Sequence, residues 1–247
     1  MTSLNWVKKT GVRVFGILLL ASAAWAQSCP PAAEKIAKAY GFDSWGQIEA
    51  VRYTFNIDIP ALKLKTSRTW TWEPKADRVT YEGKDKAGNP VKVTYVRSQL
   101  SSQPENVQKE IDPAFVNDQY WLLFPFHTCW DTGATVEDKG MQKLPLGAGT
   151  ARLVSVKYPS AGGYTPGDTW DLYIGPDNRV KQLLFRHGAG AKAPIKVTSV
   201  TWAGYKKAGP ILVSTEHKGY ADGKPLTLTF TDVAVKVTGS DAWVNAE

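Results

Sequence analysis

The sequence predicts a mainly β protein of the α+β class, in which antiparallel strands are interrupted by helices near the middle of the chain. Two observations carry this prediction. Apolar residues recur at every second position over residues 51–96 and again from about residue 134 onward, which is the period of strands with one apolar face. Between these regions, residues 101–123 take a helical spacing instead. We therefore expect about 10–11 strands joined by short, mostly antiparallel connections.

Residues 1–26 have the features of an export signal. Lys8, Lys9 and Arg13 give a basic start, an apolar segment follows over residues 14–24, and Ala24-Trp25-Ala26 is a small-x-small cleavage site. The apolar segment is shorter than the about 20 residues that a membrane-spanning helix needs. We expect cleavage after Ala26, which leaves residues 27–247 as a single domain in the periplasm.

The charge of the chain argues against nucleic acid as a partner. The sequence contains 30 basic and 23 acidic residues, and three of the basic ones fall in the export signal. Residues 27–247 then hold 27 basic and 23 acidic residues, a net charge of +4, with both signs interspersed. This balance is typical of a soluble surface and leaves room only for peripheral contact with anionic lipid headgroups.

The first strands are expected to form a meander over residues 51–96. Tyr53 and Phe55 alternate with polar residues, and the next strand places Arg68, Trp70 and Trp72 on one side. Turn residues at 74–77 and 88–90 then bring two further strands back beside them.

Helices are expected over residues 32–39, 101–111 and 112–123. Asp112 is suited to be the N-cap of the last helix and Pro113 to be its first residue. Pro125 is expected to end that helix, because proline lacks an N–H and its ring collides with the preceding turn. The aromatic run NDQYWLLFPFHTCWD, residues 117–131, is therefore interpreted as the tail of a helix and the loop beyond it.

Strands return in the second half of the chain. The segments are residues 151–158, 169–175, 180–186, 195–205, 211–218 and 226–237. Gly175-Pro176-Asp177-Asn178 is a strong hairpin signal between the second and third of them.

Cys29 and Cys129 fit two chemistries. In an oxidising compartment, an even number of cysteines suggests one disulfide, which would tie the start of the domain to the aromatic run. Alternatively, Cys29 is the lipid-modified first residue of an outer-membrane lipoprotein, although Ala26-Gln27-Ser28 before it is a poor lipobox.

Three phrases carry a resemblance to a known superfamily: TWEPKADRVTYEG (71–83), FVNDQYWLLFPF (115–126) and GDTWDLYIGPDNRVKQLLF (167–185). With the order of signal, strands, helices and strands, they resemble the periplasmic lipoprotein-localisation superfamily, the LolA/LolB-like and outer-membrane lipoprotein-sorting proteins. The likeness is one of pattern and covers most of residues 27–247. It implies a strongly curved antiparallel half-barrel whose concave apolar face is covered by the mid-chain helices and receives acyl chains.

The resemblance also implies which residues meet a hydrophobic ligand. The concave wall would comprise Tyr53, Phe55, Trp70, Trp72, Val79 and Tyr81, and the helical lid or its hinge Trp121, Leu122, Leu123, Phe124 and Phe126. An Arg poised in the lid, as in the lipoprotein carrier itself, is not evident. The simpler interpretation of each such residue is that it belongs to the core, where most large apolar side chains lie.

The sequence predicts no enzyme, no metal site and no cofactor. His127, His187 and His217 do not occur at metal-binding spacings, and neither a nucleophile elbow nor a phosphate-binding loop is present. Acid pairs such as Asp112 with Asp118 are interpreted as helix-cap and turn residues.

Three alternative functions remain open at this stage. An enzyme could use His127 and Cys129 as a base and a thiol nucleophile. A glycan-binding module would expose some of the ten Trp and ten Tyr rings as a stacking platform. A structural envelope module would have a permanently sealed core. Our expectation is a monomeric exported protein that binds a lipid, an acyl chain or a lipidated protein.

Overall fold

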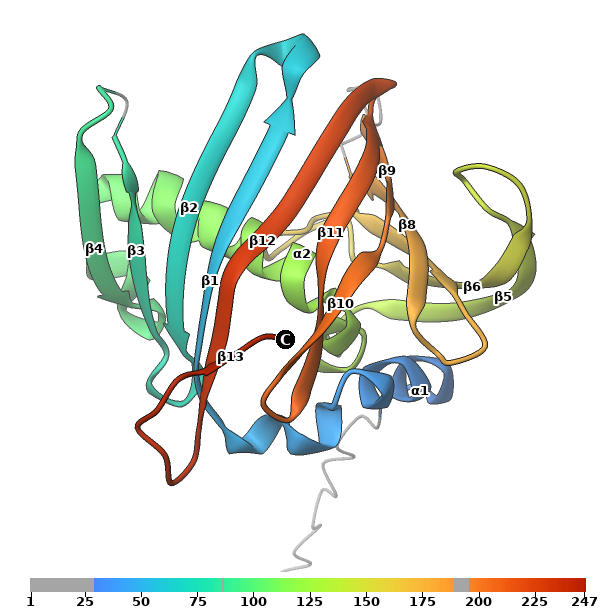
Figure 1. Cartoon of the computed structure of the whole chain (residues 1–247). Helices are drawn as coiled ribbons and strands as arrows, with labels where there is room; N and C mark the ends of the chain where they lie inside the picture. Colours follow the sequence, from blue (N-terminus) through green and yellow to red (C-terminus); the bar gives the residue numbers. More distant parts are fainter. Residues whose placement is uncertain (1–28, 86, 189–195) are drawn as a thin grey trace, which may run out of the picture.

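The structure, a computed structural model, describes residues 29–85, 87–188 and 196–247. The predicted export signal lies outside the described residues. Within them, 13 strands form one curved, unclosed antiparallel sheet that wraps around a long helix (Figure 1). This confirms the predicted fold class, with two strands more than the upper expected number. None of the described helices is both long and apolar enough to cross a membrane.

Two meanders make up the sheet. The first comprises β1 (Ile48–Ile59), β2 (Leu64–Glu73), β3 (Arg78–Lys84) and β4 (Pro90–Val96). The second comprises β5 (Thr135–Lys143), β6 (Thr150–Lys157), β7 (Thr169–Ile174), β8 (Val180–His187), β9 (Lys196–Thr201), β10 (Ala203–Ala208), β11 (Ile211–Ala221), β12 (Lys224–Val237) and β13 (Val244–Asn245). Their order is β4-β3-β2-β1-β12-β11-β9-β8-β7-β6-β5, with β10 beside β11 and β13 beside β12.

Strand β12, the last long strand, joins the two meanders into one sheet by pairing with β1. β12 pairs with β1 from Ile48↔Val237 to Asp58↔Thr227, so the end of the chain lies beside its first strand. The segment predicted as one strand over residues 195–205 is divided between β9 and β10 at Trp202, which is fully enclosed in the core.

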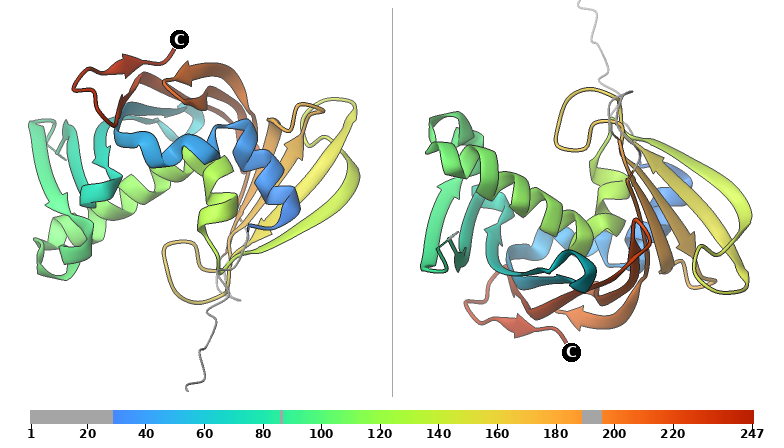
Figure 2. Two further views of the ribbon diagram at one scale, coloured as in Figure 1. Left: turned by 90° about the horizontal axis from the view of Figure 1, so that it is seen from below. Right: turned by 90° about the horizontal axis from the view of Figure 1, so that it is seen from above.

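Helix α2 (Asp112–Trp130) lies inside the curve of the sheet (Figure 2). It joins β4 to β5, which are the two edge strands, so the chain must cross the whole concave face between them. Nineteen helical residues span about 28 Å at 1.5 Å per residue. Because α2 has sheet on one side and other chain segments on the other, it is apolar around most of its circumference, as a buried helix requires.

The start of α2 differs from the prediction. Asp112 is not an N-cap: its backbone is helical, and the helix continues backward through a π-helical turn, η5 (Val107–Ile111). The Asp112 N–H bonds to the Val107 carbonyl five residues earlier. Pro113 favours this wider turn, because it has no N–H to offer the carbonyl of residue 109.

The end of α2 also differs, because Pro125 does not stop the helix. The chain kinks at Leu123, where φ is −115° and ψ is 17°, and then continues helically to Trp130. The missing proline N–H costs one hydrogen bond, but side chains beyond it are buried in the core, Phe126 among them, whose ring packs on Trp45. Burial of such aromatic side chains outweighs one lost bond, so packing overrides the local preference.

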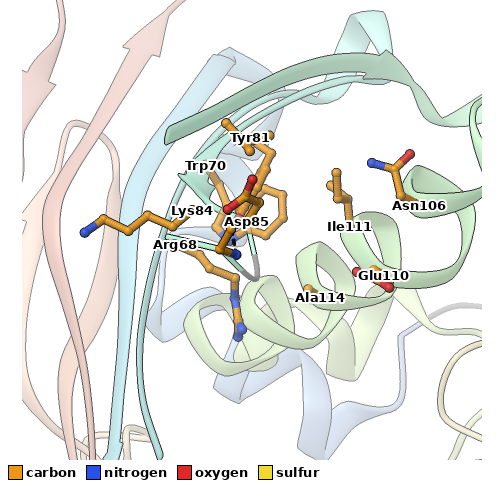
Figure 3. Close-up of a pocket in the computed structure, with 11 residues that line it drawn as sticks. Arg68, Trp70, Tyr81, Lys84, Asp85, Asn106, Glu110, Ile111 and Ala114 are labelled. Atoms are coloured by element: carbon orange, nitrogen blue, oxygen red, sulfur yellow. Dashed lines mark hydrogen bonds between the residues drawn. The ribbon is translucent and has the colours of Figure 1, made fainter. Parts of the chain in front are cut away.

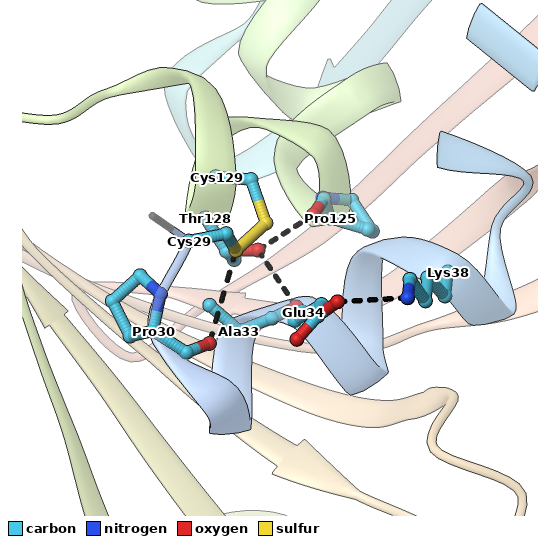
Figure 4. Close-up of a disulfide and its surroundings, with 8 residues drawn as sticks. All are labelled: Cys29, Pro30, Ala33, Glu34, Lys38, Pro125, Thr128 and Cys129. Carbon is cyan, nitrogen blue, oxygen red and sulfur yellow. Dashed lines mark hydrogen bonds and ion pairs between the residues drawn. A yellow bond between two sulfur atoms is a disulfide. The ribbon is translucent and has the colours of Figure 1, made fainter. Parts of the chain in front are cut away.

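The N-terminal segment packs on the far end of α2. Helix α1 (Pro31–Ala39) buries Ala33, Ile36 and Ala37, and a disulfide joins Cys29 to Cys129 (Figure 4). The structure thus contains the first of the two cysteine chemistries considered above.

Short turns of 3-10 helix complete the connections. They are η1 (Phe42–Gln47), η2 (Pro60–Leu62), η3 (Pro74–Ala76) and η4 (Arg97–Ser102).

Removal of the disulfide is expected to destabilise the protein without changing its fold. The bridge closes a loop of 100 residues, so Cys129→Ser should lower the free energy of unfolding by about 2–5 kcal/mol, measured by urea titration. Wild-type protein under reducing conditions is the control and should unfold at the midpoint of the variant. Equal midpoints for oxidised, reduced and variant protein would contradict this role.

Candidate functional site

An ion pair in the interior fixes the middle of α2 to the sheet. Arg68 on β2 donates from Nε and Nη2 to the Asp118 carboxylate, each at 2.7 Å, and Trp70 Nε1 donates to the same group at 2.8 Å. Asp118 is fully buried. Burial raises the pKa of Asp118, whereas the adjacent Arg68 guanidinium favours its ionised form. Helix α2 contains no arginine, but Arg68 of the sheet binds Asp118 of this helix.

A second buried acid fixes the start of α2. The Asp112 carboxylate accepts hydrogen bonds from Tyr95 Oη and Arg97 Nε, both at 2.9 Å, and from the Tyr164 hydroxyl. Tyr95 lies on β4, whereas Tyr164 belongs to the connection between β6 and β7. Two segments from opposite halves of the sheet therefore meet at this carboxylate.

A third acid does the same at the end of α2. Asp131 accepts hydrogen bonds from Tyr158 at 2.6 Å and Tyr120 at 2.7 Å, and its carboxylate lies 3.1 Å from His127 Nδ1. Burial acts to raise the pKa of Asp131, but the hydrogen bonds from His127, Tyr158 and Tyr120 outweigh it and hold this pKa below its ordinary value. Asp112 and Asp118, which were expected to cap a helix or mark turns, are thus internal anchors of α2, and Asp131 anchors its end.

A pocket of about 490 Å³ lies between the first meander and the start of the helical lid (Figure 3). Trp70 and Tyr81 face it from the sheet, and Ile111 and Ala114 face it from η5 and α2. Polar groups gather at its rim. The remaining lining residues are Arg68, Lys84, Asp85, Ala87, Val91, Asn106 and Glu110.

Gly83 shapes the wall of this pocket. A Cβ atom at residue 83 would lie 2.1 Å from the Tyr81 hydroxyl, so only glycine lets the Tyr81 side chain lie along the strand. The Tyr81 ring in turn packs on Trp70, with 4.8 Å between ring centroids. The position of Tyr81 in the pocket wall therefore depends on glycine at residue 83.

A larger polar hollow adjoins the pocket. Its volume is about 890 Å³, and it shares Arg68, Tyr81, Lys84 and Asp85 with the pocket. The rest of its lining is rich in hydroxyl and amide side chains, including Asn56, Ser67, Thr69, Thr227 and Thr229. An apolar recess thus borders directly on a hydrogen-bonding surface.

Of the eleven residues predicted to contact a ligand, the structure brings Trp70 and Tyr81 together at the pocket. The others lie elsewhere in the core. The Phe124 ring stacks on Trp170, with 4.2 Å between ring centroids. The ring centroids of Phe126 and Trp45 are 5.2 Å apart, and those of Trp121 and Trp170 are 5.0 Å apart. Tyr53, Phe55, Trp72, Val79, Leu122 and Leu123 belong to, or pack against, the same hydrophobic core.

Several pocket residues were not predictable from the sequence. Arg68 shares the face of Trp70 on β2, which the alternation indicated, but its pairing with Asp118 depends on the fold. Ile111 and Ala114 stand on a helical segment whose orientation the sequence did not define. Val91 reaches the pocket only because β4 pairs with β3, where it lies opposite Gly83.

The side chains considered for catalysis are engaged elsewhere. Cys129 is in the disulfide and has no thiol, while His127 bonds Asp131 through Nδ1 and lies 2.9 Å from Gln119 through Nε2. His217 is enclosed by Trp202, Phe230 and Trp121, and burial lowers its pKa to about 3. Among the described residues, no three metal-ligating side chains gather at one point.

Comparison with known proteins gives distant structural likenesses. No protein-family model and no curated protein matches the sequence. A DUF1329 family protein from Desulfovibrio piger is 8% identical, with a TM-score of 0.45, over 85% of this chain and 94% of that one. A LolA superfamily protein from Nitrosomonas europaea is also 8% identical, with a TM-score of 0.45, over 83% and 92%.

The lipoprotein LppX of Mycobacterium tuberculosis is 10% identical, with a TM-score of 0.30, over 83% of this chain and 96% of that one. The second of these three proteins carries the name of the superfamily that the sequence pattern resembles. At such identities and TM-scores, these likenesses carry no argument about what this chain binds.

The pair Arg68–Asp118 is expected to show strong energetic coupling. Arg68→Leu leaves the Asp118 carboxylate buried without its cation and should cost about 3–5 kcal/mol of unfolding free energy. Arg68→Leu combined with Asp118→Leu should recover a large part of that loss, because no charge is then left buried. Denaturant titration of the two single variants and the double variant measures the coupling. If the losses of unfolding free energy in the two single variants simply add up in the double variant, the two residues are not coupled.

The burial of His217 predicts acid sensitivity. Its pKa is about 3 in the folded protein against an ordinary 6.5, so between these values only the unfolded chain binds the proton. The free energy of unfolding should therefore fall as the pH drops through this window, by up to about 1.4 kcal/mol per pH unit from this group. His217→Leu should remove that part of the slope.

The control is Phe230→Leu, which disturbs the same aromatic cluster without removing a titrating group. It should lower stability at every pH and keep the wild-type slope. Urea titrations from pH 7 to pH 4 compare the three proteins. A wild-type slope in His217→Leu would show that another group is responsible.

Proposed function

We propose that this protein is an exported envelope protein that binds an acyl chain, a lipid or a lipidated protein and performs no catalysis. The pocket between β2, β3, β4 and the η5–α2 segment is its binding site. Residues 27–247 form the working domain after cleavage of the export signal. The observation that carries the proposal is the pairing of an apolar recess with a polar rim at one end of the lid.

The composition of the pocket supports an apolar guest. Its inner surface comes from Trp70, Tyr81, Ile111 and Ala114, and its volume of about 490 Å³ falls in the range of small-molecule pockets. Each buried methylene group contributes about 0.8 kcal/mol, so a partly inserted acyl chain gains several kcal/mol.

The adjoining hollow supports an amphipathic ligand. A chain inserted beside Trp70 would leave its polar end near Arg68 and Lys84, where the hydroxyl-rich surface begins. Arg68 uses Nε and Nη2 to bind Asp118, which holds its guanidinium plane fixed at the boundary. We therefore expect the headgroup or peptide portion of the ligand to face the polar hollow.

The disulfide supports the proposed compartment. A bridge between Cys29 and Cys129 is the state that an oxidising, extracytoplasmic environment maintains. With Cys29 in the bridge, its sulfur is not available for lipid attachment, so we favour a periplasmic protein over a lipid-anchored one.

Fatty acids of increasing length test the proposal. Affinity for a fluorescent fatty-acid series should rise by roughly fourfold per methylene, and level off when the chain outgrows the pocket. Ala114→Phe fills the pocket from the helical side and should weaken binding of long chains by at least about tenfold.

The matched control is Ala39→Phe, since Ala39 is also a partly buried alanine that packs against the core but lies on α1. It should bind like wild type when both variants are compared at equal folded fraction. Absence of binding by wild type, together with no lipid in native mass spectra of detergent-free preparations, would favour the sealed structural module instead.

A further inference from the structure

Three of the six large hydrophobic side chains that are exposed among the described residues lie on two hairpin turns. Leu62 and Leu64 at the β1–β2 turn are 53% and 39% exposed, and Tyr220 at the β11–β12 turn is 48% exposed. Exposed apolar side chains that gather in one place mark interaction sites more often than scattered ones do.

Strand register places these two turns side by side. β1 pairs with β12 up to Asp58↔Thr227, and both strands end within a few residues beyond that pair. The β1–β2 and β11–β12 turns therefore project from the same end of the sheet (Figure 1). The β3–β4 turn, which supplies Lys84 and Ala87 to the pocket rim, points to this end as well.

Basic residues outnumber acidic ones around the apolar tips, where Asp58 lies opposite Lys65 in the β1–β2 ladder. Residues 60–65 read PALKLK, without an acid, and Lys224 follows the second turn. Lys218 pairs with Glu216, whereas Lys63, Lys65 and Lys224 have no carboxylate partner among the described residues. Asp222, the acid of the second turn, accepts a hydrogen bond from the Val197 N–H.

We propose that this end of the protein docks on a membrane surface that contains anionic phospholipids, with the two hairpin tips inserted among the headgroups. Leu62, Leu64 and Tyr220 supply the apolar contact, and Lys63, Lys65 and Lys224 supply the charge. This combination of exposed apolar and basic side chains is complementary to an anionic interface, where lysines are attracted and apolar tips leave water. The inference goes beyond the proposed function and holds whether or not the pocket is occupied.

The geometry explains why docking here would serve the pocket. Lys84 and Ala87 of the pocket lining belong to the β3–β4 hairpin, whose turn points to the same end as the tips (Figure 1), so a ligand leaving the bilayer would have a short path to Tyr81. A soluble protein partner fits less well, because the tips are two narrow turns and offer no broad flat surface.

Vesicle sedimentation tests the proposal. Wild-type protein should sediment with vesicles of phosphatidylcholine and phosphatidylglycerol, and much less with phosphatidylcholine alone. Leu62→Asp combined with Leu64→Asp should lower the partition coefficient by at least about tenfold. Lys63→Glu combined with Lys224→Glu should lower it as well, and salt near 1 M should weaken wild-type binding because it shortens the Debye length to about 3 Å.

Met141→Asp is the matched control, because Met141 is 64% exposed and lies on the distant edge strand β5. The Met141→Asp variant should sediment like wild type. None of the substituted positions lines the pocket or the polar hollow, so fatty-acid binding in solution should be unchanged in every variant. That readout separates failure of docking from failure of the proposed function. Equal sedimentation of wild type and the Leu62, Leu64 variant, or no sedimentation of wild type with anionic vesicles, would overturn the proposal.

Discussion

The architecture depends on one constraint: a single helix joins the two edge strands of a sheet that never closes. Because β4 and β5 are the edges and α2 is the connection between them, the helix must run through the concave side. Three acids fix its start, middle and end to side chains of the sheet and its connections: Asp112 and Asp118, which are buried, and Asp131, which is partly buried. Such groups are costly to bury without partners, and this cost makes the position of the helix specific.

The pocket forms where this packing is incomplete. Beyond Asp118 toward the end of α2, aromatic rings fill the space between helix and sheet, as Phe124 against Trp170 illustrates. Toward its start, the π turn before Pro113 widens the helix, and the small Ala114 side chain leaves a recess beside Tyr81, which Gly83 allows to lie along its strand. Helix α2 is thus anchored, with a recess at one end, and in the proposed function it need not swing open for an acyl chain to enter.

The inner and outer faces of the curved sheet differ in the side chains that they carry. Curvature gathers the apolar side chains of β1, β2 and β12 inside, and leaves hydroxyl and charged side chains outside. At the β1–β2 and β11–β12 turns, apolar side chains reach water, since a turn has no inner face on which to bury them. A recess for an apolar chain and an apolar, basic tip consequently lie at the same end of the sheet.

The sequence by itself determined the class of fold, the alternation of the strands and the presence of a central aromatic helix, because these follow from the period of apolar residues. The alternation also placed Arg68, Trp70 and Trp72 on one side of their strand, whereas Tyr81 joined Trp70 on one inward face only through the resemblance to a known superfamily. It did not determine that Pro125 lies within a helix or that Asp112 is buried, because local rules assign both to a helix end and only burial against the sheet overrides them. The pairing of Arg68 with Asp118 was decided by tertiary structure alone, since the two residues are 50 positions apart and meet only when the chain crosses from one sheet edge to the other.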